Sequence, residues 1–155
     1  MRFLVFSDSH GKTLHLKNAM HCHNEADAII FLGDGIQSVK NILSSSDKPY
    51  YIVRGNCDIG SNEKDLFFIE CNNHKIMFCH GHRYHVKYGL EQLISTAKIN
   101  LCDIVLFGHT HIPLAKYIDN IYLLNPGTIS QSPTPSYGIL DITEKGVIVS
   151  TATIQ

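Results

Sequence analysis

The segment Ile29-Ile30-Phe31-Leu32-Gly33-Asp34-Gly35 decides the fold of this chain, because an apolar run leads directly into an aspartate between two glycines. A short apolar run bounded by turn residues indicates a buried strand of a parallel sheet. The same order, an apolar run and then Asp, Asn or His beside Gly, recurs along the chain. The other strand-like runs cover residues 3–6, 51–53, 76–79 and 104–107, and the polar stretches after them are Ser7-Asp8-Ser9-His10-Gly11, Gly55-Asn56-Cys57-Asp58, His80-Gly81-His82 and Gly108-His109-Thr110-His111; Asn125-Pro126-Gly127-Thr128 is a further stretch of this kind.

These polar residues are predicted to gather at one edge of a sheet. In open α/β proteins, ligands bind where the carboxyl ends of the strands meet. Carboxylate, amide and imidazole groups together are the ligands that divalent metals of intermediate hardness prefer. The glycines beside Asp34 would leave room for ions to approach its carboxylate from both sides. Taken singly, each motif also fits an ordinary turn or a helix cap.

The apolar pattern alternates between strand and helix spacing in the first two-thirds of the chain. Helical spacing predicts a first helix that ends near Asn24 and a second that is stopped by residues 44–47 and Pro49. The third predicted helix follows Gly89 and includes Leu101 in its apolar stripe. The apolar positions are Leu16, Ala19 and Met20 in the first helix, Ile36, Val39, Ile42 and Leu43 in the second, and Leu90, Leu93, Ile94, Ala97 and Leu101 in the third.

Pairs of strands joined by tight turns dominate the rest. Asn72-Asn73 and Asp119-Asn120 tolerate the left-handed turn conformation, and residues 144–146 turn a final pair of strands. The chain thus begins as βαβαβ and continues largely as a β-meander, whose strands would form most of a second sheet. We therefore predict a mixed α/β fold in which two packed sheets are flanked by helices, an αββα sandwich.

Bulk composition is that of an ordinary globular enzyme. With 155 residues, 44% of them hydrophobic and 17% charged, we expect one domain over residues 1–155. Residues 1–3 lead directly into a strand, so we expect no signal sequence and no membrane association. The odd number of cysteines, five, indicates reduced thiols in the cytoplasm. The net charge of −1 without a basic run argues against a long nucleic-acid track, and a homo-oligomer stays open.

The motifs in this order resemble the calcineurin-like metallophosphoesterases, whose signature is D-x-H, G-D, G-N, a lone H and G-H-x-H. The resemblance runs from Asp8 to Thr128, and Cys57-Asp58 after Gly55-Asn56 is most similar to the small YfcE-like phosphodiesterases of bacteria and archaea. It implies the same αββα sandwich and a phosphodiesterase in which a hydroxide bridging two divalent metal ions attacks phosphorus in line. The substrate would be a small phosphoester. Mn²⁺ is the first choice, with Ni²⁺, Co²⁺, Fe²⁺ and Zn²⁺ as alternatives.

The resemblance also implies roles for individual residues. Asp34 would bridge the two ions, and Asn56 would hold a metal while touching a phosphate oxygen. Each histidine ligand should donate its second ring N–H to a carbonyl or carboxylate. The loop at residues 125–128 would support the site through its backbone. The first metal would be held by Asp8, His10, Asp34 and His111, and the second by Asp34, Asn56, His80 and His109.

Cys57 departs from the larger members of the superfamily, which carry G-N-H-E with a histidine thought to protonate the leaving group. A thiol is a poor proton donor, and Cys57 also fits a small buried residue. His82 is an alternative phosphate contact or proton donor, or a surface residue, and Asp58 could orient a neighbouring ligand. The remaining histidines, at positions 15, 21, 23, 74 and 85, we interpret as solvated or interface residues.

Other functions compete with this hypothesis. The same compact fold serves in a eukaryotic retromer subunit as an interaction scaffold with an impaired site, and a phosphomonoesterase is a further alternative. A scaffold would need a partner surface, for which exposed tyrosines are candidates. A metal-storage module is disfavoured because Asp34 and Asn56 suit catalysis better than tight sequestration. The candidate surface tyrosines are Tyr50, Tyr51, Tyr84 and Tyr88.

Overall fold

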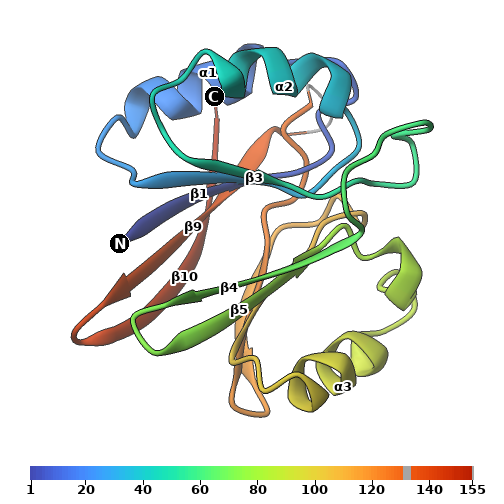
Figure 1. Ribbon diagram of the computed structural model, residues 1–155, viewed down its shortest axis with the longest axis vertical. Helices are drawn as coiled ribbons and strands as arrows, with labels where there is room; N and C mark the ends of the chain where they lie inside the picture. Colours follow the sequence, from blue (N-terminus) through green and yellow to red (C-terminus); the bar gives the residue numbers. More distant parts are fainter. Residues whose placement is uncertain (131–133, 155) are drawn as a thin grey trace.

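The structure is a computed structural model that describes residues 1–130 and 134–154. These residues form two five-stranded sheets with helices on their outer faces (Figure 1). The order of elements is β1 (Arg2–Phe6), α1 (Leu14–Cys22), β2 (Ala28–Phe31), α2 (Ile36–Ser44), β3 (Tyr50–Ile52), β4 (Leu66–Cys71), β5 (His74–Cys79), the 3-10 helix η1 (His82–Tyr84), α3 (Glu91–Ile99), β6 (Ile104–Leu106), β7 (Leu114–Ile118), β8 (Ile121–Asn125), β9 (Ser136–Thr143) and β10 (Gly146–Thr153).

The first sheet has the order β10-β9-β1-β2-β3, and its three N-terminal strands run parallel. Because side chains alternate along a strand, Leu4 and Phe6 of β1 pack under α1 and α2, whereas Phe3 and Val5 face the other sheet. Helices α1 and α2 cover this outer face with their apolar stripes. Leu16 of α1 and Val39 and Leu43 of α2 are buried there. The predicted βαβαβ half is thereby confirmed.

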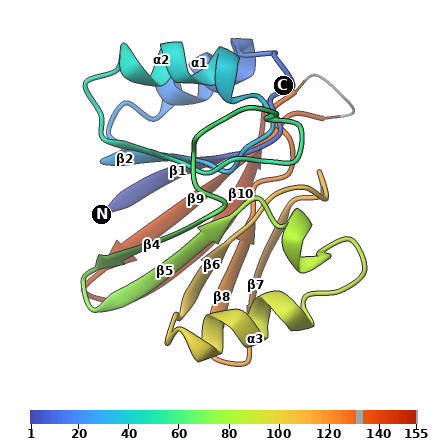
Figure 2. The same cartoon turned by 45° about the vertical axis from the view of Figure 1, so that its right-hand side comes forward.

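The second sheet has the order β4-β5-β6-β8-β7, in which β5, β6 and β8 run parallel. Ile76 and Phe78 of β5 join the core between the sheets, and Met77 and Cys79 face α3. Figure 2 shows α3 on the face of this sheet that points away from α1 and α2. Both sheets thus bury one face on each other and one under helices, which confirms the αββα sandwich.

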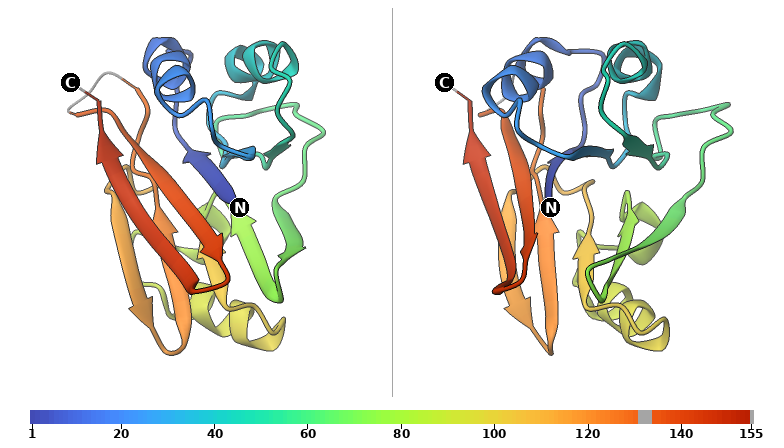
Figure 3. Two further views of the ribbon diagram at one scale, coloured as in Figure 1. Left: turned by 90° about the vertical axis from the view of Figure 1, so that its left-hand side faces the viewer. Right: turned by 60° about the vertical axis from the view of Figure 1, so that its left-hand side comes forward.

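The hairpin strands form most of the second sheet as expected, but the final pair does not join it. β9 pairs antiparallel with β1, and Arg2 lies opposite Asp141 in that register. The crossovers through α1 and α2 place β2 and β3 on one side of β1, so the other edge of β1 is open and β9 pairs with it. In Figure 3 the pair β9 and β10 lies beside β7 and β8, which β10 contacts.

The third helix is shorter than its apolar stripe predicts. α3 ends at Ile99, and Leu101 adopts a left-handed conformation with φ of 58° and is 83% exposed. The N–H of Cys102 donates to the carbonyl of Ala97 at 2.9 Å, a bond that closes the helix end around the left-handed residue. The predicted turns at residues 72–73 and 119–120 are present, with positive φ at both positions of each.

None of the helices within residues 1–130 and 134–154 combines the length and the apolar character needed to cross a membrane.

Candidate metal centre

The loops after β1, β2, β3, β5 and β6 bring the predicted strand-end residues together at one edge of the sandwich. Three overlapping groups of side chains each place their potential ligand atoms within 4.8 Å of one another. The groups are Asp8, His10 and His111; Asp34, His80 and His109; and His10, Asp34 and Cys57.

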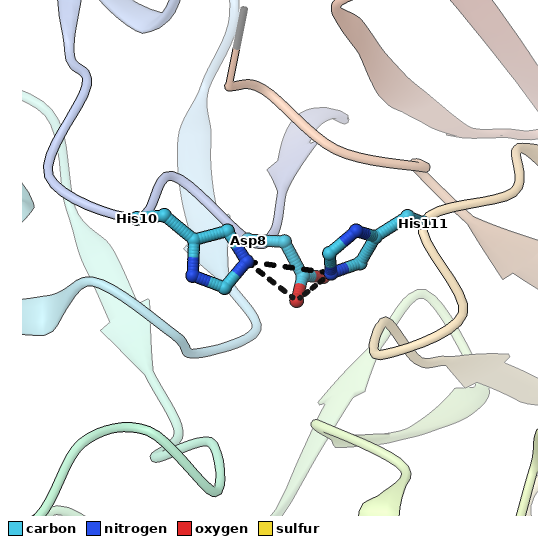
Figure 4. A group of neighbouring side chains, drawn as sticks. All are labelled: Asp8, His10 and His111. Carbon is cyan, nitrogen blue, oxygen red and sulfur yellow. Dashed lines mark hydrogen bonds and ion pairs between the residues drawn. The ribbon is translucent and has the colours of Figure 1, made fainter. Parts of the chain in front are cut away.

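The first group joins the ends of β1 and β6 (Figure 4). His111 Nε2 lies 3.0 Å from Asp8 Oδ1 and 3.3 Å from His10 Nε2. The distance from His10 Nε2 to the same Asp8 oxygen is 3.8 Å. Asp8 is fully buried, while the His10 and His111 side chains are partly exposed, so the group opens to the surface on its histidine side.

The second group joins the ends of β2, β5 and β6. His80 Nε2 lies 3.4 Å from Asp34 Oδ2 and 3.2 Å from His109 Nδ1. The other ring nitrogen of His80, Nδ1, donates to the carbonyl of Leu32 at 2.8 Å, which fixes the ring with Nε2 directed at Asp34. The expectation that a histidine ligand donates its second N–H is therefore met at His80.

The protonation of the second group suits metal binding. Burial opposes ionisation of Asp34, but the hydrogen bond and charge of His80 hold the pKa of this carboxyl well below its usual value. Burial and the charge of His80 lower the pKa of His109 to about 4. At neutral pH the group therefore presents a carboxylate and, at His109, an uncharged imidazole, which are the forms that bind metals.

These donors fit a divalent metal of intermediate hardness. In the first and second groups two imidazole nitrogens face each other, at 3.3 Å between His10 and His111 and at 3.2 Å between His80 and His109. Mixed nitrogen and carboxylate donors of this kind suit Mn²⁺, Fe²⁺, Co²⁺, Ni²⁺ or Zn²⁺. The structure thus brings together side chains that can hold metal, but from the strand ends of both sheets rather than from the edge of one sheet as predicted.

The backbone around these side chains is held in an uncommon conformation. Non-glycine residues rarely adopt positive φ, and such strain persists only where the surrounding structure enforces it. Strain of this kind is concentrated at functional sites. The candidate ligands with positive φ are Asp8 (55°), His10 (44°), Asp34 (60°), His109 (68°) and His111 (61°).

Asp8 and the loop after β6 are positioned by Ser7, which had no role in the sequence interpretation, and by the loop at residues 125–128, which was expected to act through its backbone. Ser7 Oγ donates to Asp8 Oδ2 at 2.5 Å, and the N–H of His109 donates to the same oxygen at 3.1 Å. Asn125 Nδ2 donates to the carbonyl of Gly108 at 3.1 Å, and Thr128 Oγ1 donates to the carbonyl of Asp8 at 2.8 Å. The loop at residues 125–128 therefore supports the site through side chains. A polar residue directly after a buried strand was the signal available in the sequence for Ser7 and Asn125.

Asp58 orients the loop that carries Asp34, as the sequence interpretation allowed. Its carboxylate accepts hydrogen bonds from the backbone N–H groups of Asp34 at 2.7 Å and Gly55 at 2.8 Å. It also accepts from Gly35 at 2.8 Å and Ile36 at 2.9 Å, the first amides of α2. One side chain thus caps α2 and ties the end of β3 to the end of β2.

Replacing Asp58 with alanine should lower the free energy of unfolding by about 2–4 kcal/mol. The loss of a helix cap costs about 1 kcal/mol, and leaving further buried amides without acceptors costs about 1–3 kcal/mol. Urea denaturation of Asp58→Ala checks this, with Asp47→Ala in the exposed loop before β3 as the matched control. Equal midpoints for the two variants would contradict the assigned role.

Gly33 and Gly55 allow the loops after β2 and β3 to pack closely against each other. A Cβ on Gly33, which has φ of 97°, would lie 2.3 Å from the backbone nitrogen of Gly55. A Cβ on Gly55 would lie 2.0 Å from Asp34 Oδ1. The two loops therefore approach too closely for any side chain at these positions.

Gly33→Ala should destabilise the protein by about 1–3 kcal/mol more than Gly60→Ala, the cost of overpacking a site whose neighbour is backbone. Gly60 is a matched control because its φ of 80° imposes similar strain, yet its Cβ would meet nothing within 4 Å. Thermal denaturation of both variants measures the difference. If Gly33→Ala proves no less stable than Gly60→Ala, the close approach is unimportant.

Cys57 is exposed, which contradicts its interpretation as a small buried residue. Its N–H donates to Asp34 Oδ1 at 2.8 Å, so the backbone hydrogen bond holds the residue at the surface of the site. Partial desolvation and the neighbouring Asp34 raise the pKa of the Cys57 thiol to about 11. Asn56 is also exposed, and its Nδ2 lies 3.3 Å from Cys57 Sγ.

The remaining histidines divide into several environments. The ring of His82 lies with its centroid 5.4 Å from that of His80 and 6.1 Å from that of His109, so it borders the second group. His21 and His85 are exposed as expected. His23 and His74 are instead half-buried and bonded, to Tyr137 at 2.8 Å and to Asp103 respectively, because each packs against an element distant in the sequence.

A cleft of about 720 Å³ adjoins the candidate centre, and His10 and Cys57 are among its lining residues. Its walls are α2 and residues 57–63. An ion pair of 2.8 Å between Lys40 of α2 and Glu63 links the two walls. The lining combines polar side chains with apolar surface, so polar groups for a ligand lie next to the candidate metal ligands. Its uncharged polar side chains include Gln37, Ser38, Asn41, Ser61 and Asn62.

Comparisons with known proteins identify the family of this chain. The family profile described as calcineurin-like phosphoesterase superfamily domain matches residues 1–145. The chain is 32% identical over 146 residues to the probable metallophosphoesterase YsnB of Bacillus subtilis, covering 92% of this chain and 85% of that protein. It is 27% identical over 168 residues to the phosphodiesterase YfcE of Escherichia coli K12, covering 91% of this chain and 88% of YfcE.

Solved structures share the architecture. A predicted phosphoesterase from Streptococcus pneumoniae TIGR4 superposes with a TM-score of 0.84 and 27% identity, covering 98% of this chain and 88% of that one. Vps29 of Entamoeba histolytica, complexed with Zn²⁺, superposes with a TM-score of 0.78 and 22% identity, covering 99% of each chain. At that identity the likeness to Vps29 concerns the fold alone.

Proposed function

The chain belongs to the calcineurin-like phosphoesterase superfamily, and from this premise we propose that it hydrolyses phosphodiesters with two divalent metal ions. The observation that carries the proposal is the contact between two groups of potential ligands. His80 Nε2 lies 3.4 Å from Asp34 Oδ2 and 3.9 Å from Asp8 Oδ1, so a ligand of one group borders the carboxylate of the other. Adjacent groups of this kind suit a pair of ions.

The proposed ligands follow the strand ends. Asp34 would be shared by both ions, and Mn²⁺ is the first choice among the metals that this donor set fits. When bound, such ions lower the pKa of a shared water and neutralise charge on the phosphate. The first ion would be held by Asp8, His10, Asp34 and His111, and the second by Asp34, Asn56, His80 and His109.

Other residues of the chain bind and orient the substrate. Asn56 is exposed beside Cys57, where its amide can turn from the thiol toward a phosphate oxygen. His82 is the candidate proton donor, since it borders the second group and reaches no hydrogen-bond partner through its buried Nδ1. The cleft beside His10 and Cys57 takes an ester substituent, which favours a diester over a monoester because a diester carries a second substituent on phosphorus.

The proposal requires that hydrolysis depend on added metal. Purified protein should bind about two Mn²⁺ ions per chain. It should cleave bis(p-nitrophenyl) phosphate faster than p-nitrophenyl phosphate, and chelator should stop both reactions. Bound metal at a hundredfold excess over its Kd should stabilise the fold by about 2.7 kcal/mol, visible as a raised Tm. His21→Ala, on an exposed part of α1, is the control and should match wild type.

One bound ion or none after reconstitution, or hydrolysis that survives exhaustive chelation, would contradict the dinuclear centre. Faster cleavage of the monoester would instead favour the phosphomonoesterase.

The interaction-scaffold alternative loses most of its proposed surface in the structure. Tyr50, Tyr51 and Tyr84 are half-buried and pack against the core clusters, because alternation along β3 and the position of η1 turn them inward. Tyr88 alone of the four tyrosines is exposed, at 92%. The assay above also separates this alternative from the enzyme, since a scaffold needs no metal-dependent turnover.

We also propose a cytoplasmic location, supported by the five cysteines, none of which pairs with another. A homo-oligomer remains part of the proposal and is testable by light scattering.

A further inference from the structure

Cys57 stands within reach of two of the proposed metal ligands. Its sulfur, a ring nitrogen of His10 and a carboxylate oxygen of Asp34 all lie within 4.8 Å of one another. A zinc ion holds sulfur at about 2.3 Å and imidazole nitrogen at about 2.0 Å, so one ion can draw such atoms together with small side-chain rotations. The group therefore has the composition and spacing of a mixed thiolate, imidazole and carboxylate site.

The thiol is held in this position by its neighbours. The backbone N–H of Cys57 donates to Asp34 Oδ1 at 2.8 Å, which ties the residue directly to one member of the group. Asn56 Nδ2 lies 3.3 Å from Sγ on the other side. Cys57 is nevertheless exposed, and together with His10 it lines the cleft, so a metal ion can reach the sulfur from solvent.

We infer that Cys57 is a metal-discriminating ligand: Zn²⁺ and Co²⁺ bind its sulfur together with His10 and Asp34, whereas Mn²⁺ leaves the thiol free. The reason is ligand softness, since thiolate sulfur favours Zn²⁺ and related ions, and Mn²⁺ favours carboxylate, carbonyl and water oxygen. Binding displaces the thiol proton to solvent, so one proton is released for each ion that takes the sulfur.

The inference deepens the proposed function because it concerns the same site. His10 also belongs to the first group and Asp34 to the second, so an ion on the sulfur draws on residues of both. A thiophilic ion thus competes with the oxygen-preferring ions for these two residues. Nitrogen and oxygen donors bind divalent metals in a general order of affinity. The thiol adds ligand softness, by which this site distinguishes Zn²⁺ and Co²⁺ from Mn²⁺.

The first test is spectroscopic and uses the whole chain with Co²⁺ alone. Wild type should show a near-ultraviolet sulfur-to-cobalt charge-transfer band that Cys57→Ser lacks. Cys22→Ser is the matched control, since Cys22 is also exposed but belongs to none of the candidate metal groups of residues 1–130 and 134–154. The control should keep the band. No band in wild type, or an undiminished band in Cys57→Ser, would overturn the inference.

The second test counts reactive thiols with a disulfide reagent. Zn²⁺ should protect one exposed thiol of wild type and none of Cys57→Ser, while Mn²⁺ should protect neither. The affinity of Cys57→Ser for Zn²⁺ should be at least about tenfold lower than that of wild type, because loss of a residue at a metal site typically has an effect of this size. Its affinity for Mn²⁺ should be unchanged. Equal protection by Zn²⁺ and Mn²⁺ would overturn the discrimination.

Both readouts are independent of turnover. A cobalt band in a protein without phosphodiesterase activity would leave this inference standing and reject the proposed function. Metal-dependent hydrolysis without the cobalt band would support the proposed function and reject this inference.

Discussion

Asp34→Asn should reduce metal-dependent hydrolysis of an aryl diester by at least about a hundredfold in kcat/KM, as loss of a metal-site residue does. Asp34 is buried, belongs to two of the three candidate groups and lies 3.4 Å from His80 Nε2. Asparagine keeps the size of the side chain and can still accept the Cys57 N–H, but it removes the negative charge between the proposed ions. Steady-state kinetics with Mn²⁺ and elemental analysis of the reconstituted variant measure the two effects.

The matched control is Asp47→Asn, an exposed aspartate remote from the strand-end residues, which should behave as wild type. Circular dichroism should show that Asp34→Asn folds, since the Asp58 carboxylate still accepts the amides around position 34. Full activity with two bound ions in a folded Asp34→Asn protein would reject the bridging role.

Rates across a series of diesters should depend steeply on the pKa of the leaving group. The thiol at position 57, where the larger relatives carry a histidine, has a pKa raised to about 11 and therefore protonates a departing alkoxide poorly at neutral pH. Catalysis then rests on charge stabilisation and on how well the leaving oxygen bears negative charge. Aryl diesters should be cleaved far faster than alkyl diesters, which kcat/KM over a graded series of substituted phenols measures.

Two variants locate the proton donor. Cys57→His should flatten the dependence, because Cys57 is exposed in the lining of the cleft and a ring has space to enter there. Cys57→Ser should leave the slope as it is. If His82 supplies the proton, His82→Ala should steepen the slope while the metal content stays the same. A flat wild-type series under conditions where chemistry limits the rate would show that an efficient acid is already present.

Local sequence patterns predicted most of the elements. The strand at residues 29–32, the helix after Gly35 and the turns at Asn72-Asn73 and Asp119-Asn120 depend on contacts between near neighbours and on the conformations that each residue tolerates. The pairing of β9 with β1 depends instead on which sheet edge is open after the crossovers, and strands more than a hundred residues apart carry no local sign of it. α3 ends before Leu101 because Leu101 adopts a left-handed conformation. The apolar stripe includes Leu101 and gives no sign of that conformation.

By itself the sequence determined the candidate ligands, because each motif follows an apolar run that ends a strand. The expectation that these strands share one sheet is wrong, since β1, β2 and β3 belong to one sheet and β5 and β6 to the other. The tertiary structure alone decided how those ligands are held. The Leu32 carbonyl that orients His80 and the Asp58 carboxylate that binds four amides act across separate loops. The tertiary structure also decided that Cys57 is exposed and that Tyr51 packs against the core. Hydrogen bonds and exposure depend on the distance between segments, and a linear order of residues specifies no such distance.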